Sequence, residues 1–133
     1  KLFHWRQHRL DRVFECWEAH KKVGYIFNTG SFSTYMPQAE FRRYSILKRA
    51  LDVANQQCCK KIEGGSCSVR MTLLKPGMLD TPASRQKPHW RGGGVGGQEM
   101  ARIIEHLYKL PAHLLVNEIV LAGILPREQE KNL

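Results

Sequence analysis

The chain has 133 residues and a mass of 15.4 kDa, which is enough for one small domain with a hydrophobic core. Its composition, 42% hydrophobic and 25% charged, is typical of a globular protein and excludes a disordered chain. No apolar run is long enough to span a bilayer, and no apolar segment follows the basic N-terminus. We therefore expect neither a membrane span nor a secretory signal.

The formal net charge is +9 at pH 7, and the pI is near 9.7. Such an excess of cations favours an anionic partner, which can be a nucleic acid, a nucleotide phosphate or an acidic surface. The basic residues are spread over many short clusters and do not form one long tract. A solvated surface is therefore the more common explanation for most of them.

The four cysteines, Cys16, Cys58, Cys59 and Cys67, include no C-x-x-C pair. Two adjacent cysteines are a poor framework for a disulfide or a zinc site. In the absence of a secretory signal, we expect reduced thiols and a cytoplasmic protein.

Residues 1–20 predict an amphipathic helix, because apolar side chains recur at spacings near three and four; they are Leu2, Trp5, Leu10, Val13, Phe14 and Trp17. His4 and His8 are four residues apart and would face one side of this helix, where two imidazoles can share a metal ion. The sequence shows no third ligand, so we predict no metal site.

Residues 23–28 (VGYIFN) form a short apolar run that predicts a strand buried on both faces, as in parallel sheets. Residues 29–37 are rich in Gly, Ser and Thr, which is typical of a loop. This loop, which includes Ser31, would leave the carboxyl end of the strand. Open α/β sheets place their ligands at that end.

Residues 38–60 predict a long helix with an apolar face made of Phe41, Tyr44, Leu47, Ala50, Leu51 and Ala54. Tyr44 and Lys48 are four residues apart, so both would project from the same side, about one turn from each other. The sequence EGG at 63–65 would break the chain after this helix.

Residues 69–74 (VRMTLL) predict a second buried strand, which Pro76-Gly77 would end sharply. Residues 83–97 are polar and rich in glycine, and we interpret them as a flexible loop over a substrate. The glycines superficially resemble a phosphate-binding loop, but they follow a polar segment instead of a strand, which makes this alternative the weaker one.

A third helix over 98–110, a third strand over 117–122 and a charged tail over 127–133 complete the prediction. Helices and buried strands thus alternate along the chain. This order predicts a single α/β domain with a parallel sheet and right-handed crossovers.

The residue types at the predicted strand ends indicate proton transfer. A tyrosine in water titrates near pH 10, too high for a base near neutrality, but a lysine ammonium one helical turn away stabilises the phenolate. A serine hydroxyl at the mouth of the adjacent strand can hydrogen-bond a substrate oxygen. Tyr44, Lys48 and Ser31 would together interconvert a carbonyl and an alcohol. The hydride for this reaction comes from no side chain, so a nicotinamide cofactor is implied.

These residues carry a specific resemblance. Tyr44-Ser45-Ile46-Leu47-Lys48 matches Y-x-x-x-K, and Ser31 lies thirteen residues before Tyr44. Pro76-Gly77 with Thr81 matches a P-G-x-x-x-T turn, and residues 117–122 match a closing strand. The chain therefore resembles the C-terminal half of the short-chain dehydrogenase/reductase family over nearly its whole length. The resemblance implies part of a doubly wound, Rossmann-like parallel sheet.

The resemblance also implies roles for single residues. Tyr44 would be the general acid/base, Lys48 would hold the ribose of NAD or NADP and favour the phenolate, and Ser31 would orient the substrate oxygen. Pro76, Gly77 and Thr81 would contact the nicotinamide side of the cofactor. The substrate would be a small alcohol or carbonyl compound.

Two features depart from the family. The N-terminal βαβ half, with the glycine-rich turn that binds pyrophosphate and the residue that selects NAD or NADP, is not present in this sequence. The chain starts at Lys1, so we expect a fragment or a processed product, whose first two strands would expose an unpaired edge to a partner. The relay asparagine of the family would fall near Phe3 and His4, where no asparagine stands.

We expect a homodimer or homotetramer, because the family pairs its subunits through the counterparts of the first two helices. One alternative is a truncated, non-catalytic relative that serves as an assembly or binding module. A second is a basic protein that interacts with nucleic acid. It ranks third because no aromatic and basic RNA-binding motif is visible.

Overall fold

The computed structural model describes residues 11–13, 15–17, 19–20, 23–35, 42–64, 69–88, 90 and 92–123. Its elements in chain order are β1 (Gly24–Thr29), the 3-10 helix η1 (Phe32–Thr34), α2 (Arg42–Glu63), β2 (Val69–Pro76), α3 (Pro82–Arg85), α4 (Gly97–Lys109) and β3 (Glu118–Leu121). The predicted first half of the N-terminal helix, the histidine pair His4 and His8, and the tail over 127–133 lie outside the described residues.

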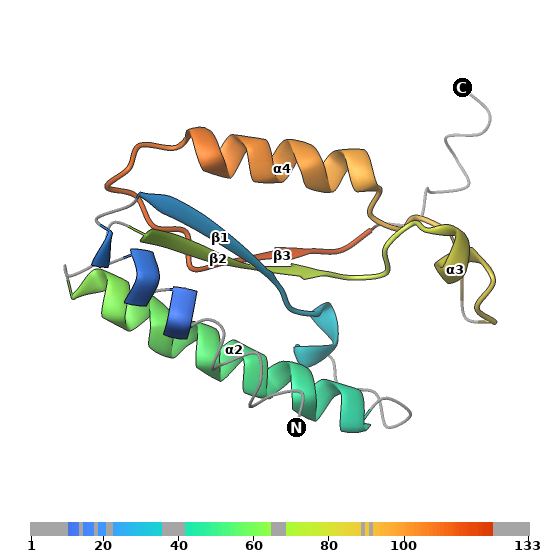
Figure 1. The fold of residues 1–133 in the computed structure, drawn as a ribbon. Helices are drawn as coiled ribbons and strands as arrows, with labels where there is room; N and C mark the ends of the chain where they lie inside the picture. Colours follow the sequence, from blue (N-terminus) through green and yellow to red (C-terminus); the bar gives the residue numbers. More distant parts are fainter. Residues whose placement is uncertain are drawn as a thin grey trace.

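The elements form three layers (Figure 1). The sheet has the order β1-β2-β3, and both pairs of neighbouring strands are parallel. One face of the sheet is covered by α4, and α2 lies on the opposite face. The predicted α/β class with a parallel sheet is therefore confirmed. No helix in the described ranges has the length and apolar character needed to cross a membrane.

The central strand β2 supplies much of the core, because it has a strand on each side and a helix over each face. Residues 71–74 of the predicted run are buried, as predicted, and the burial extends to residues 75 and 76. The prediction of burial on both faces is wrong for β1, whose residues 24–28 are only half-buried. The reason is topological: in the described sheet β1 is an edge strand that pairs with β2 alone.

The helix α2 packs on the sheet through a face that agrees with the prediction at Leu51 and Ala54 and differs from it at Tyr44 and Leu47. Its buried residues are Ser45, Leu51, Asp52, Ala54, Asn55, Cys58 and Cys59. Tyr44 and Leu47, which were expected on the apolar face, are 47% and 60% exposed. The periodic pattern predicted the helix correctly but indicated the wrong face near its start, because several buried positions of α2 are polar.

The cysteines of α2 contribute to the core on this side of the sheet. Cys58, Cys59 and Met71 pack together, with Ile26, Ile62 and Leu115 against them. Burial raises the pKa of Cys58, and burial with the charges of Cys58 and Glu63 raises that of Cys59 to about 11. The described cysteines, Cys16, Cys58 and Cys59, are free thiols.

The segment after β2 is more ordered than the predicted flexible loop. Residues 82–85 form the short helix α3, and Leu79 pairs with Val95 in an isolated parallel bridge that closes the segment at its base. Gly92 and Gly93 have φ angles of +82° and +65°, a conformation that only glycine adopts readily. The glycines here therefore shape a turn that leads into α4.

Arg70 joins the sheet to the carboxyl end of α4. Its guanidinium donates hydrogen bonds to the backbone carbonyls of Leu110 (2.9 Å) and Tyr108 (3.1 Å), and it lies 4.5 Å from the ring centroid of Tyr25. The last carbonyls of a helix lack partners within the helix, and a cation at that end is favourable. Arg70 thus caps α4 from the neighbouring layer.

We expect Arg70→Met to lower the free energy of unfolding by about 1–3 kcal/mol, because the variant keeps an apolar stem and loses both charged hydrogen bonds. Urea denaturation measures the change. The control is Arg102→Met on the exposed surface of α4, for which we expect less than about 0.5 kcal/mol. Equal effects of the two substitutions would contradict the capping role.

Candidate functional site

The candidate site lies at the carboxyl ends of β1 and β2. The two strands are parallel, and their register pairs Thr29 with Leu74. The segments that follow them therefore leave the sheet at the same end. Ser31 follows β1 by two residues, and Pro76 is the last residue of β2. Tyr44 and Lys48 lie in the first two turns of α2.

The Ser31 side chain is buried and acts as the N-cap of η1. Its oxygen accepts a hydrogen bond from the backbone N–H of Ser33 at 3.2 Å and shares a second one with the Ser33 hydroxyl at 2.9 Å. The carbonyl of Ser31 accepts hydrogen bonds from both the N–H and the hydroxyl of Thr34. The residue predicted to orient a substrate is thus held in a well-defined turn.

Tyr44 and Lys48 lie near each other, as their spacing predicted. The Lys48 ammonium is 5.7 Å from the centroid of the Tyr44 ring. It also donates a hydrogen bond to the carbonyl of Thr29 at 3.1 Å, which ties α2 to the end of β1. No hydrogen bond joins Tyr44 to Ser31 in the part of the chain that the structure describes.

The turn after β2 is held by hydrogen bonds to β3 and within the turn itself. The N–H of Gly77 donates to the carbonyl of Leu121 at 2.6 Å. The hydroxyl of Thr81 caps α3, where it accepts from the N–H of Ser84 at 3.1 Å. Next to it, the Arg85 guanidinium lowers the pKa of Asp80 through an ion pair. A cofactor amide at this turn would compete with these bonds or use the remaining lone pairs.

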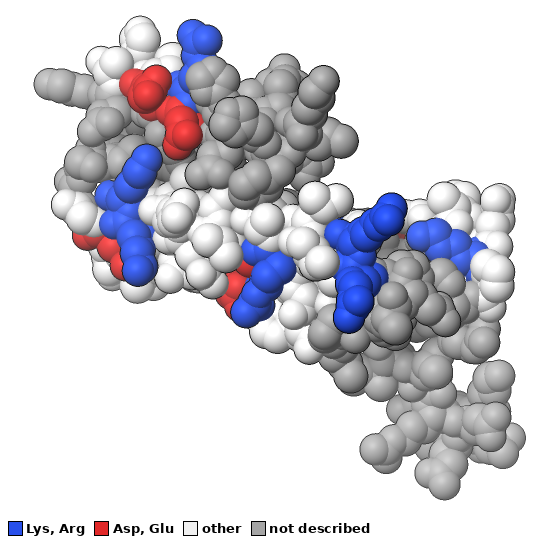
Figure 2. Space-filling model, turned by 90° about the horizontal axis from the view of Figure 1, so that it is seen from below, with Lys and Arg blue, Asp and Glu red and all other residues white. Residues whose placement is uncertain are grey.

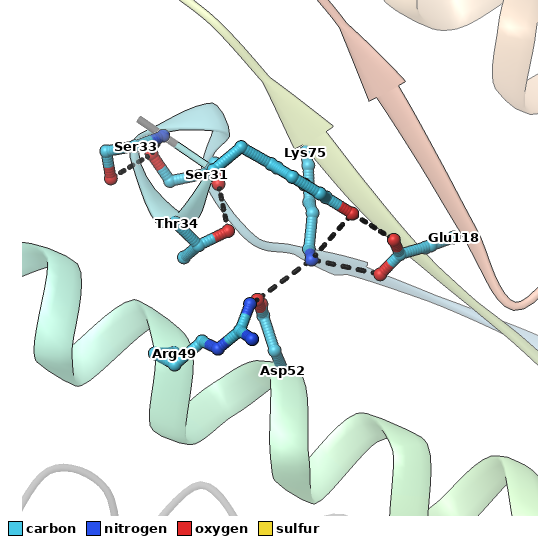
Figure 3. A network of polar contacts seen from close by, with 8 residues as sticks. Ser31, Ser33, Thr34, Arg49, Asp52, Lys75 and Glu118 are labelled. Carbon is cyan, nitrogen blue, oxygen red and sulfur yellow. Dashed lines mark hydrogen bonds and ion pairs between the residues drawn. The ribbon is translucent and has the colours of Figure 1, made fainter. Parts of the chain in front are cut away.

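The sequence analysis missed a buried cation directly before Pro76. Lys75 is 1% exposed, and its ammonium lies 2.8 Å from Asp52 Oδ2 and 2.9 Å from Glu118 Oε2. It is also 3.4 Å from the hydroxyl of Tyr35, which in turn donates to Glu118. Figure 3 shows Lys75 between α2, β3 and the segment that carries Ser31. A lysine inside a run of buried apolar residues was the signal that could have revealed it.

The charges of this cluster compensate each other. Burial by itself lowers the pKa of Lys75, but the contacts with the Asp52 and Glu118 carboxylates outweigh it and raise the pKa. The hydrogen bond from Tyr35 and the contact with Lys75 lower the pKa of Glu118 despite its partial burial. The same hydrogen bond raises the pKa of Tyr35. Lys75 therefore stays charged, and Tyr35 stays a proton donor at neutral pH.

The contact between Lys75 and Asp52 is an ion pair with imperfect hydrogen-bond geometry. By hydrogen-bond criteria, neither carboxylate oxygen of Asp52 has a partner within the described residues. The second cation near Asp52, Arg49, is 3.9 Å away and mostly exposed. We therefore attribute the stabilisation of the buried carboxylate mainly to Lys75.

A cavity of about 440 Å³ lies elsewhere, between the glycine segment 93–95, the side chains of Glu99 and Ile103, and residues 121–123. None of the predicted site residues lines it. The Glu99 carboxylate accepts a hydrogen bond from the N–H of Gly96 at 2.6 Å, so an anion already occupies the amino end of α4. This arrangement disfavours phosphate binding there. Across the described ranges, His, Cys, Asp and Glu residues form no cluster of three or more suited to a metal ion.

The comparisons with known proteins give a consistent but distant likeness. No protein-family model matches the sequence. An uncharacterized oxidoreductase of Staphylococcus epidermidis is 26% identical over 101 residues, and one of Staphylococcus saprophyticus is 28% identical over 101 residues. The match covers 76% of this chain in both cases, and 43% and 42% of the two relatives. The match thus spans less than half the length of these curated relatives.

Solved structures show where the fold recurs. A betaketoacyl-ACP reductase from Bacteroides thetaiotaomicron has a TM-score of 0.69 at 22% identity, covering 93% of this chain and 50% of that one. A serine dehydrogenase from Escherichia coli has a TM-score of 0.66 at 19% identity, covering 86% and 46%. The closed form of a serine dehydrogenase complexed with NADP+ has a TM-score of 0.59 at 18% identity, covering 72% and 42%. The chain therefore has the α/β fold of about half of such a reductase or dehydrogenase.

The lowered pKa of Glu118 predicts how the stability of the fold changes as the pH falls. A carboxylate with a lowered pKa in the folded state stabilises the fold above its ordinary pKa, 4.5 here, and this contribution is lost as the pH falls through the folded value. We expect Glu118→Gln to lose less stability than the unmodified protein between about pH 6 and about pH 3. The control is Glu105→Gln, which removes an exposed carboxylate paired with Lys109. Identical pH profiles for the Glu118 variant and the unmodified protein in urea denaturation would contradict the prediction.

Proposed function

We propose that the chain is part of an NAD(P)-dependent oxidoreductase of the short-chain dehydrogenase/reductase type, which interconverts a hydroxyl and a carbonyl group. The observation that carries the proposal is the hydrogen bond from Lys48 to Thr29, which places the Tyr44/Lys48 turn of α2 beside the strand end that leads to Ser31. The names of the sequence relatives, all oxidoreductases, support this assignment.

In the proposed reaction each of the three candidate residues has one role. Tyr44, whose side chain is 47% exposed, gives its hydroxyl proton to the substrate oxygen or receives it in the reverse direction. Lys48 presents a cation beside the phenol, and Ser31 orients the substrate oxygen. A bound nicotinamide would supply the hydride. The proton therefore moves at Tyr44 Oη, and Ser31 would exchange its bond to Ser33 for one to the substrate.

The described residues fit only one side of the cofactor. Lys48 and the Gly77 to Thr81 turn lie at the carboxyl ends of β1 and β2, where we propose that a nicotinamide ribose is held; one structural neighbour was solved with NADP+. The pyrophosphate needs a glycine-rich turn between a strand and a helix, and the glycine segment at 92–97 follows no strand. We propose that the remaining part of the site comes from sequence or a subunit beyond the described residues.

The proposal includes a single partial Rossmann-like domain over 1–133 and assembly into homodimers or homotetramers. The exposed apolar side chains Leu47 and Val53 on α2 support a helix-to-helix contact between subunits. The nucleic-acid alternative receives less support. On the face that α2 covers, the described Lys and Arg side chains lie in separate groups and form no continuous stripe (Figure 2).

The first test is the intact mass of the natural protein together with a fluorescence titration of NADH and NADPH. Nucleotide binding by a protein about twice the mass of this chain supports the proposal, because the sequence relatives are about twice as long. A protein of 15.4 kDa without nucleotide binding would contradict it and favour the non-catalytic assembly module.

The second test is Tyr44→Phe, which removes only the hydroxyl. We expect turnover of the carbonyl substrate to fall by at least about 100-fold, because general acid/base catalysis typically contributes this much or more. The matched control is Tyr108→Phe on α4, where the tyrosine is 65% exposed. Full activity of the Tyr44 variant would exclude the proposed proton transfer.

A further inference from the structure

We propose that Lys75 is a positioning residue, which holds the Ser31 segment (residues 30–35) and the helix that carries Tyr44 and Lys48 in one fixed arrangement. The inference rests on the proposed function, since it concerns the same three candidate groups. It adds a residue that none of the motifs contains. The supporting contacts come from β2, β3, α2 and the Ser31 segment (Figure 3).

Lys75 contacts the Ser31 segment at both of its ends. At the first end, Gly30 packs directly on the lysine stem: a Cβ at Gly30 would lie 3.0 Å from Lys75 Cγ. At the other end, the Tyr35 hydroxyl is 3.4 Å from the ammonium, which lies 4.5 Å from the centroid of the Tyr35 ring. One side chain therefore touches the residues that precede and follow the turn capped by Ser31.

Lys75 also contacts the side of α2 on which the proposed reacting residues lie. Tyr44, Lys48 and Asp52 succeed each other at intervals of four, so they share one side of the helix. Lys75 reaches Asp52 at 2.8 Å, one turn beyond Lys48. Lys48 itself reaches back to the carbonyl of Thr29. Two cations, Lys48 from α2 and Lys75 from β2, thus hold the first half of α2 against the carboxyl ends of β1 and β2.

A lysine suits this position better than an apolar residue for a directional reason. Burying an ion pair gains little stability over a well-packed apolar pair, because the desolvation of both charges is costly. An ammonium can instead hold two carboxylates in ion pairs and donate a hydrogen bond to a third oxygen. Here they are Asp52 from α2, Glu118 from β3 and the hydroxyl of Tyr35. The cluster therefore fixes the position of α2 and of the Ser31 segment relative to the sheet, whereas apolar packing alone would let these elements slide against each other.

The test measures amide hydrogen exchange by NMR in two variants. Tyr35→Phe removes one anchor at a site that is 46% exposed, and so leaves the fold intact. Lys75→Met with Asp52→Leu removes both fully buried charges together, while Glu118, which is partly exposed, keeps its hydrogen bond from Tyr35. We expect the amides of Thr34 and Tyr35, which donate to Ser31 and Phe32, to exchange about fivefold to tenfold faster in both variants.

Amides of α4 serve as the internal reference, and Tyr108→Phe is the matched control variant. Faster exchange at Thr34 and Tyr35 with unchanged exchange in α4 supports local positioning. Unchanged exchange at these two amides, or an equal increase throughout the chain, would overturn it. This measurement needs no enzymatic activity, so its result stands even when the protein turns over no substrate and the proposed function fails.

In a natural protein that does turn over a carbonyl substrate, kinetics give the second readout. We expect the double variant to lower kcat by about tenfold and to leave the KM for the nicotinamide nucleotide within about twofold, because the Ser31 segment would be displaced while Lys48 keeps its hydrogen bond to Thr29. Unchanged kcat together with faster exchange would show that Lys75 orders the segment without positioning it for the reaction.

Discussion

The structure depends on one buried cation, Lys75, and on its pairing with the carboxylate of Asp52 across the interface between β2 and α2. Both side chains are almost fully removed from water, so the loss of Lys75 alone would leave the Asp52 carboxylate in the core without its main compensating cation. This constraint fixes the depth at which α2 sits on the sheet. The position of α2 in turn fixes where Tyr44 and Lys48 stand relative to the strand ends.

The parallel pairing of the strands sets the second condition for the site. Because β1 and β2 run in the same direction and in a defined register, Ser31 and the Pro76-Gly77 turn leave the sheet side by side. An antiparallel pair would have placed them at opposite ends of the sheet. Glu118 from β3 closes the same edge through its contact with Lys75. All the candidate groups thus belong to one rim of the sheet.

The sequence predicted the order of the elements because apolar periodicity reports burial over a whole strand or helix. The bounds of β2 and α4 agree with the prediction to within two residues. The buried face of α2 was predicted correctly at Leu51 and Ala54 but wrongly near the start of the helix. Ser45, Asp52 and Asn55 are polar core residues, and periodicity counts only apolar ones. Lys75 was missed for a related reason: its partners Tyr35, Asp52 and Glu118 are far away in sequence, and only the fold brings them together. The catalytic roles of Tyr44, Lys48 and Ser31 remain predictions from motif spacing.

The adjacent thiols of α2 make the packing of this helix observable. Cys58 and Cys59 face the core, and both have raised pKa values, so at neutral pH they are neutral and shielded from reagents. An alkylating reagent can modify them only when α2 lifts from the sheet. Cys16, which is exposed, reacts independently of that opening. The labelling rate of Cys58 and Cys59 relative to that of Cys16 therefore reports how often α2 separates from the sheet.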